Sequence, residues 1–253
     1  KADGTIENFK YNAKDPHSLS SNFVRACCED NLGNIWIGTF NGLNRYNKIT
    51  GLFQNHTAND TQADGLTHSS IWCIVKDNQG TLWLGTYFGG VNYFNPEYEI
   101  YTRYSYSSNE KKGLSNLVVG RTIEDKDGNL WIGTEGGGLN YYNRRTREFK
   151  WYRPQEGRNS ISHNNVKALY YDADKEIIWI GTHLGGLNKL DIRSGHFTHY
   201  RMEEGNPNTL PSDIIRDIIP YKSLLIIATQ NGVCLFDLSL IHISEPTRHS
   251  LIS

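Results

Sequence analysis

Short runs of alternating apolar and polar residues, separated by turn residues, follow one another along the chain, and one of these runs recurs. Its first copy reads NIWIGTFNGLNRYN. The copies lie at residues 34–47, 81–95, 129–143, 177–191 and, in a degenerate form, 224–237. Each copy carries one marker residue, 47 or 48 positions from the next: Trp36, Trp83, Trp131, Trp179 and Ile226. A period of this length, kept over nearly the whole chain, predicts a repeat architecture.

Each repeat has the pattern of four short strands. In the first repeat we expect them at residues 23–30, 34–39, 42–47 and 51–57. A glycine recurs in the first turn, where we expect positive φ: Gly33, Gly80 and Gly128. No segment shows the 3.6-residue period of a helix. Four antiparallel strands per repeat predict the blades of an all-β β-propeller, with the tryptophan packed between blades and the following Gly-Thr pair at a close backbone approach.

The repeats divide the chain into about five blades. Four complete blades are expected at residues 18–58, 65–106, 113–153 and 160–202, with a partial fifth at 209–237. Residues 4–12 resemble the fourth strand of a preceding blade. We therefore expect an open arc of a larger propeller, although this N-terminal strand could instead complete the fifth blade and close a five-bladed ring.

The last residues do not continue the repeat. Residues 238–248, LSLIHISEPTR, look like the translation of an adapter used in sequencing libraries. We expect 238–253 to be a non-native tail and exclude it from the fold. A native irregular tail is the alternative.

Charge and cysteine content narrow the function classes. The net charge of −1 gives no electrostatic reason to expect contact with nucleic acid or a membrane surface. No apolar run approaches the roughly 20 residues that span a bilayer. The four cysteines lack metal-ligand spacing, and we expect buried free thiols, with a disulfide left open: Cys27, Cys28, Cys73 and Cys234.

The repeated string (D/N)-G-N-(I/L)-W-I-G-T-x-x-G-G-L-N-x-Y-N resembles the two-component regulator propeller repeat over residues 4–237. Two departures are the missing tryptophan of the fifth copy and the fourth turn, DADKE, which lacks glycine. The resemblance implies a seven-bladed propeller, of which this chain would be an arc. It also implies the periplasmic sensor region of a hybrid two-component histidine kinase and response regulator in Gram-negative, glycan-degrading bacteria. Its membrane helix, kinase, receiver and DNA-binding domain would lie outside this chain.

The resemblance also implies what the chain does. It would detect oligosaccharides from polysaccharide breakdown and regulate glycan-utilisation genes, as part of a homodimeric full-length protein. No enzyme activity, cofactor or metal is expected of this chain. A propeller scaffold for dimerisation or partner docking is one alternative. A propeller-fold glycosidase or lyase is another, and it would need paired carboxylates roughly 5–9.5 Å apart.

When the repeats are aligned, a position with the same residue in every repeat serves the scaffold. A position, or column, whose residue differs from repeat to repeat is free to bind a ligand. The two residues after each Gly-Thr pair vary, at Phe40-Asn41, Tyr87-Phe88, Glu135-Gly136, His183-Leu184 and Gln230-Asn231. These pairs fall at the hairpin between the second and third strands of each blade. The connections between blades lie at the same end of the blades, which we call the rim, and add Asn22, His68, Asn116, His163 and Asn164. Aromatic and planar hydrogen-bonding groups suit sugars, so this rim is a candidate ligand site. Alternatively, these loop residues are merely unconstrained.

A second column lies near the start of each first strand, where a propeller lines its central channel. It holds Arg25, Trp72, Gly120, Lys167 and Arg216, with Arg121 adjacent. The cations could face an acidic sugar or a sulfate. Hydrogen bonding between blades is the structural alternative.

Catalytic motifs do not emerge from the sequence. His196 and His199 would point to opposite faces of a strand, so they do not form a metal pair. No nucleophile elbow, phosphate loop or zinc-binding helix is present. The recurring acids Asp30, Asp77 and Asp125 fit turn capping.

Overall fold

The computed structural model describes residues 4, 6–58, 65–96 and 100–238. These residues form five antiparallel sheets, four of them four-stranded and the last three-stranded. The first sheet contains β1 (Val24–Glu29), β2 (Ile35–Thr39), β3 (Gly42–Tyr46) and β4 (Phe53–His56). The second contains β5 (Ile71–Lys76), β6 (Leu82–Thr86), β7 (Val91–Asn95) and β8 (Ile100–Tyr104). The predicted all-β class with four-stranded blades is confirmed.

The other three sheets have the same order of strands along the chain. The third contains β9 (Val119–Glu124), β10 (Leu130–Thr134), β11 (Gly138–Asn143) and β12 (Glu148–Tyr152). The fourth contains β13 (Val166–Asp172), β14 (Ile177–Thr182), β15 (Leu187–Asp191) and β16 (Phe197–Tyr200). The fifth contains β17 (Ile215–Tyr221), β18 (Leu224–Thr229) and β19 (Gly232–Asp237). A short 3₁₀-helix, η1 (Glu110–Lys112), precedes β9. We call the sheets blades 1 to 5; each lies within the range of one predicted blade.

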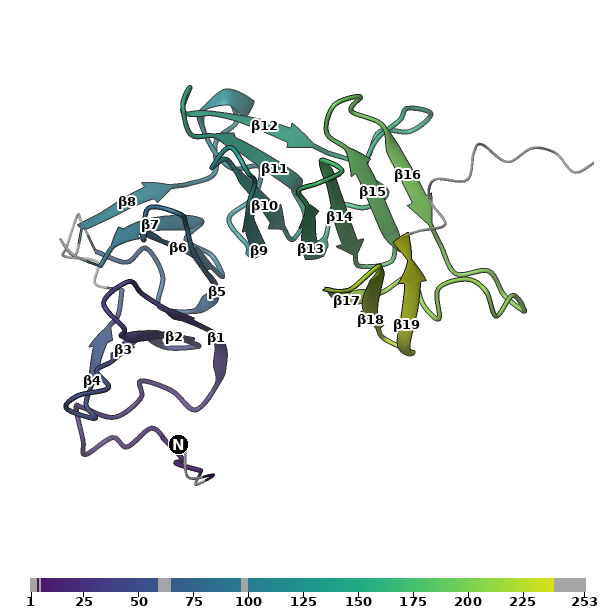
Figure 1. The fold of residues 1–253 in the computed structure, drawn as a ribbon. Helices are drawn as coiled ribbons and strands as arrows, with labels where there is room; N and C mark the ends of the chain where they lie inside the picture. Colours follow the sequence, from purple (N-terminus) through teal and green to yellow (C-terminus); the bar gives the residue numbers. More distant parts are fainter. Residues whose placement is uncertain (1–3, 5, 59–64, 97–99, 239–253) are drawn as a thin grey trace, which may run out of the picture.

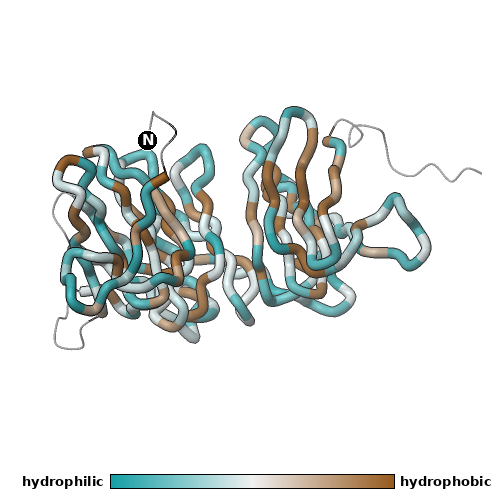
Figure 2. The backbone as a smooth tube through the Cα atoms, turned by 90° about the horizontal axis from the view of Figure 1, so that it is seen from below, coloured by the Kyte–Doolittle hydropathy of each residue, from teal (hydrophilic) through white to brown (hydrophobic). Residues whose placement is uncertain are grey.

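The blades follow one another along an arc (Figure 1). The first strands of successive blades, β1, β5, β9, β13 and β17, are neighbours on its concave side. The hydrophobic positions run along the strands, whereas the connections are mostly hydrophilic (Figure 2). Side chains that reach the concave side from the first strands are therefore brought together, although they are far apart in sequence.

The repeated tryptophan packs between adjacent blades, as the repeat predicted. Trp36 is fully buried, and its ring lies 5.1 Å from that of Phe94 in blade 2. The turn before the tryptophan anchors its indole, because an aspartate that is buried in blades 1 and 2 and half-buried in blade 3 accepts a hydrogen bond from Nε1. The distances are 2.7 Å for Trp36–Asp30, 2.8 Å for Trp83–Asp77 and 3.2 Å for Trp131–Asp125. The aspartate thus serves the core as well as the turn.

The glycine before the threonine allows the next blade to approach. A Cβ on Gly38 would lie 2.7 Å from Cγ2 of Ile71, and one on Gly181 would lie 2.4 Å from Cγ2 of Ile215. The glycine of the first turn has φ near +80° in three blades: Gly33, Gly80 and Gly128. The predicted positive φ of the turn glycine is confirmed. The glycine before the threonine also allows a close approach, but a side chain of the next blade and not its backbone fills the space, so the predicted backbone approach is wrong.

Blade 4 departs from this pattern at the turn that lacks glycine. Here Glu176 takes positive φ, and the turn places one more residue between Asp172 and the tryptophan, Trp179. Nε1 of Trp179 is buried without a hydrogen-bond partner among the described residues. The longer turn therefore removes the acceptor that the other blades supply.

The N-terminal segment packs on blade 1 without joining a sheet. Among the described residues from 4 to 12, only Tyr11 pairs, in an isolated parallel bridge to Leu19. The Phe9 ring lies 5.0 Å from Tyr46 and 5.3 Å from Phe53. Tyr104 of the fourth strand of blade 2 makes the equivalent contacts with blade 3. The interpretation of 4–12 as a fourth strand stays a prediction.

The predicted non-native tail begins at Leu238, but the structure places this residue in blade 5. Leu238 is 7% exposed in the core of blade 5, and its N–H donates to the Ser223 carbonyl over 2.8 Å. The rest of the predicted tail, residues 239–253, lies outside the described residues. The four cysteines are free, but only Cys73 is fully buried, and the expectation of burial is wrong for Cys27, which is exposed.

Replacing Asp30 by alanine should lower the free energy of unfolding by about 2–3 kcal/mol, because several donors lose a buried acceptor. Burial alone would raise the pKa of Asp30, but hydrogen bonds from Asn34, Trp36 and Leu32 outweigh it and lower the pKa. The stabilisation is therefore present above pH about 4 and is lost as pH falls through the folded-state pKa. Urea unfolding at several pH values measures it. Asp127→Ala, in an exposed turn position, is the control; equal midpoints for both variants at neutral pH would contradict the role.

Candidate functional site

Every first strand carries a β-bulge at one and the same column. In β1 the pairing shifts between Val24 and Ala26, so that Arg25 is the extra residue. The corresponding shifts occur in β5, β9, β13 and β17. The bulged residues are Arg25, Trp72, Gly120, Lys167 and Arg216. This is the second column singled out in the sequence, and a bulge is a device that re-aims a side chain out of the regular pleat.

The bulged residues of all five blades line one pocket of about 360 Å³, together with Arg121 and Glu135. We call it the bulge pocket. Gly120 contributes no side chain, which leaves space between the bulged residues of the neighbouring blades. A second hollow of about 370 Å³, which shares Arg25 and Arg121, continues along the inner strands past Cys73. The structure thus brings the predicted channel cations together.

Positive charge predominates in the bulge pocket. Lys167 forms an ion pair with Glu135 of blade 3. Arg121 of blade 3 reaches Asp217 of blade 5, with Nη2 and Oδ2 3.2 Å apart. Arg25 and Arg216 form no ion pair with any described residue. The pocket therefore holds two arginines whose charge is not compensated by a neighbouring carboxylate.

A stack of side chains forms one wall. The Arg25 guanidinium lies 4.1 Å from the centre of the Trp72 ring. The other partner of Trp72 is Tyr87, stacked at 5.4 Å with 13° between the planes. Tyr87 in turn contacts Phe88 at 4.2 Å, and Phe88 is 56% exposed. Nε1 of Trp72 is buried and has no partner among the described residues. The predicted rim residues Tyr87 and Phe88 are thus continuous with the bulge pocket.

The connections between blades contain a repeated turn cap that the sequence analysis missed. The side chains of His68, Asn116 and His163 each accept a hydrogen bond from the backbone N–H two residues ahead. The equivalent serines, Ser21 and Ser212, do the same. One acceptor per blade at one position indicates a scaffold role. The available signal was the spacing, because each of these residues lies two positions after a leucine or isoleucine that recurs once per repeat: Leu19, Leu66, Leu114, Ile161 and Leu210.

The remaining rim residues lie apart from the bulge pocket. His163 and His183 face each other with ring centres 6.4 Å apart. Burial lowers the pKa of His163, and His183 and Arg201 lower it further. Phe40 is 54% exposed, and the centre of its ring lies 6.5 Å from that of Phe23. Asn41 and Gln230 are exposed, at the tips of their hairpins.

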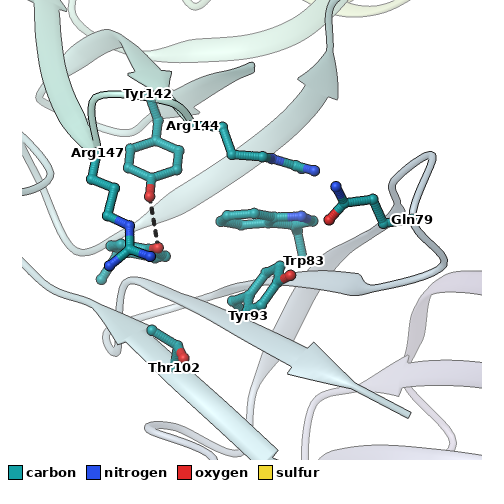
Figure 3. A pocket seen from close by; sticks show the side chains of 8 residues that line it. Gln79, Trp83, Tyr93, Thr102, Tyr142, Arg144 and Arg147 are labelled. Atoms are coloured by element: carbon teal, nitrogen blue, oxygen red, sulfur yellow. Dashed lines mark hydrogen bonds between the residues drawn. The ribbon is translucent and has the colours of Figure 1, made fainter. Parts of the chain in front are cut away.

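A larger hollow lies elsewhere, between blades 2 and 3 at the end opposite the rim (Figure 3). This crevice of about 550 Å³ has aromatic walls, and the Tyr104 and Tyr142 hydroxyls are hydrogen-bonded at 2.9 Å. Burial, then the bond to Tyr142, raises the pKa of Tyr104. The Arg144 guanidinium lies over Trp83 and pairs with Asp77 at 3.0 Å. The crevice thus consists mainly of the packing between blades, and the charge of the half-buried Arg144 is already neutralised.

A comparison with family models matches the family described as Two component regulator propeller at residues 18–41, 65–88, 113–136 and 160–183. The chain is built from two component regulator propeller repeats. Each matched segment runs from a blade connection through the first two strands of a blade to the hairpin that follows. It therefore contains both the bulged residue and the varied rim residues of that blade.

Solved structures show the same fold around these repeats. The extracellular domain of the "putative hybrid two component system BT4673" from B. thetaiotaomicron has 24% sequence identity and a TM-score of 0.69; the match covers 84% of this chain and 27% of that one. That of the "putative hybrid two component system BT3049" from the same organism has 22% identity and a TM-score of 0.67, over 87% and 34%. Virginiamycin B lyase from Staphylococcus aureus has 12% identity and a TM-score of 0.59, over 85% and 70%.

Two further results limit the comparison. The chain spans 27% and 34% of the lengths of the two extracellular domains, so much of each has no counterpart here. No curated protein matches the chain. Within the described residues, no helix is long and apolar enough to cross a membrane, and no cluster of three metal-ligating side chains is present.

Proposed function

We propose that the chain is part of the extracytoplasmic sensor region of a hybrid two-component histidine kinase and detects oligosaccharides released from polysaccharides. The repeats and the likeness to extracellular domains of hybrid systems support the sensor role. The observation that carries the ligand class is the wall formed by Trp72, Tyr87 and Phe88 next to a polar pocket. Sugars present apolar C–H faces to aromatic rings and hydroxyls to polar groups.

Signalling would follow from differential binding. In the full-length homodimer in the inner membrane, the ligand favours one arrangement of the propeller and the domains that follow it. A ligand that bound both arrangements equally would transmit nothing. The propeller needs no catalytic group for this function. The likeness to a lyase extends to the fold, and Glu135, the carboxylate in the bulge pocket, is engaged by Lys167.

Phe88→Ala should weaken oligosaccharide binding about five- to tenfold, because it removes an exposed aromatic surface next to the pocket. Calorimetric titration of the chain with a panel of plant and algal oligosaccharides measures the affinity. Leu32→Ala is the matched control, because Leu32 is 73% exposed and lies in a turn at the other end of its blade. If no oligosaccharide bound to the unaltered chain, the sensing role would be wrong and a scaffold role would be favoured.

A further inference from the structure

We propose that the bulge pocket binds an anionic group, so that the oligosaccharide detected carries a carboxylate or a sulfate; this inference rests on the proposed function. It names the ligand class that neither the repeat family nor the fold specifies. Four blades supply cations to one pocket of about 360 Å³: Arg25, Arg121, Lys167 and Arg216.

The balance of charge in the pocket favours an anion from outside the chain. Two carboxylates, those of Glu135 and Asp217, are already paired with Lys167 and Arg121. Arg25 and Arg216 remain without a described carboxylate partner. The uncompensated charges of these two arginines at one small pocket repel each other, and a bound anion would relieve that repulsion. Guanidinium groups also match the planar oxygens of carboxylates and sulfates.

The geometry argues against a purely structural role for these arginines. Cations that served the contact between blades would reach a carboxylate or a carbonyl of the next blade, as Lys167 does with Glu135. Arg25 reaches the next blade only by stacking on the Trp72 ring, which leaves its guanidinium N–H groups without a described acceptor. Arg216 is exposed, and no described residue bonds to its side chain. Both are bulged residues, placed outside the regular ladder of their strands.

Other groups in the pocket suit the rest of the same ligand. Gly120 lines the pocket with backbone alone, because it has no side chain. Tyr87 and Phe88 continue the wall outward, toward the next sugar unit. An acidic sugar would thus place its anionic group among the arginines and its apolar face toward the aromatic wall.

Calorimetric titration with paired ligands tests the inference. Oligogalacturonides are compared with neutral galacto-oligosaccharides of equal length, and sulfated carrageenan-derived oligosaccharides with neutral agarose-derived ones. The first pair tests a carboxylate and the second a sulfate. We expect one acidic series to bind and its neutral counterpart to bind at least about tenfold more weakly. Raising the ionic strength should weaken binding of the acidic ligand.

Arg25→Gln and Arg216→Gln should each weaken the binding of the acidic ligand about tenfold. Neither substitution leaves a buried partner unpaired. Arg145→Gln, at an exposed position in a hairpin at the far end of blade 3, changes the net charge equally and should have no effect. Two results would overturn the anionic site and leave the sensing role intact. One is that neutral ligands bind as tightly as acidic ones, and the other is that both pocket variants bind acidic ligands with unchanged affinity. Failure of every ligand, acidic and neutral, would overturn the proposed function itself.

Discussion

Trp83→Ala is expected to lower the free energy of unfolding by about 3–5 kcal/mol, the range for removing a large buried aromatic side chain. Trp83 is 2% exposed and lies between blades 2 and 3 (Figure 3). Its ring stacks on Tyr104 at 5.7 Å and lies 5.9 Å from Tyr142 of the next blade. The substitution therefore opens a cavity at the contact between two blades and also leaves the buried Asp77 without its indole donor.

Chemical denaturation measures this loss, and two variants separate its parts. Trp83→Phe keeps most of the apolar volume but removes the N–H, so its cost should be clearly smaller. Phe23→Ala removes an aromatic ring that is 73% exposed and should change the free energy of unfolding by less than about 0.5 kcal/mol. A Trp83→Ala variant as stable as the Phe23→Ala variant would contradict the assignment of the repeated tryptophan to the core.

Trp72→Ala should weaken oligosaccharide binding by about thirtyfold, because tryptophans at the centre of a binding site commonly contribute about 2 kcal/mol. This side chain supports Arg25 on one face and Tyr87 on the other, and it lines the bulge pocket. The change should cost little stability compared with Trp83→Ala, since Trp72 is only half-buried, on the inner strand of its blade. Calorimetric titration gives the affinity, and denaturation gives the stability of the same variant.

Trp151 provides a matched control within the chain. Like Trp72, it is half-buried, and the guanidinium of Arg153 lies 4.5 Å from the centre of its ring. Unlike Trp72, it lies on the fourth strand of blade 3, away from the channel. Trp151→Ala should leave the affinity unchanged. Trp72→Phe should retain part of it because a ring remains between Arg25 and Tyr87. Equal affinities for Trp72→Ala and Trp151→Ala would exclude the wall from the binding site.

Much of the fold could be predicted because its determinants are local and repeated. The tryptophan, the turn glycine and the Gly-Thr pair recur at fixed spacing, and each has one structural requirement: a buried ring, positive φ or a close approach. The column of Arg25 and Trp72 was visible in the same way, since five aligned positions differed in charge and size.

The contacts that give the site its character depend on tertiary structure. The pair Arg121–Asp217 joins blades 3 and 5, and no repeat pattern indicates which carboxylate reaches which cation. The β-bulges leave no mark in composition. His68 and His163 resembled ligand groups because the register of the turn cap was not recognised, whereas the backbone uses their Nδ1 atoms. Trp179 lost its acceptor through one additional turn residue, an effect visible only in three dimensions.

The most direct test of the central claim is a crystal structure of the chain with its tightest-binding oligosaccharide. We expect the anionic group within hydrogen-bonding distance of Arg25 or Arg216, and a sugar ring over Gly120 with its neighbour against Phe88. A ligand seated in the crevice between blades 2 and 3, or on any surface away from the bulged residues, would contradict the account.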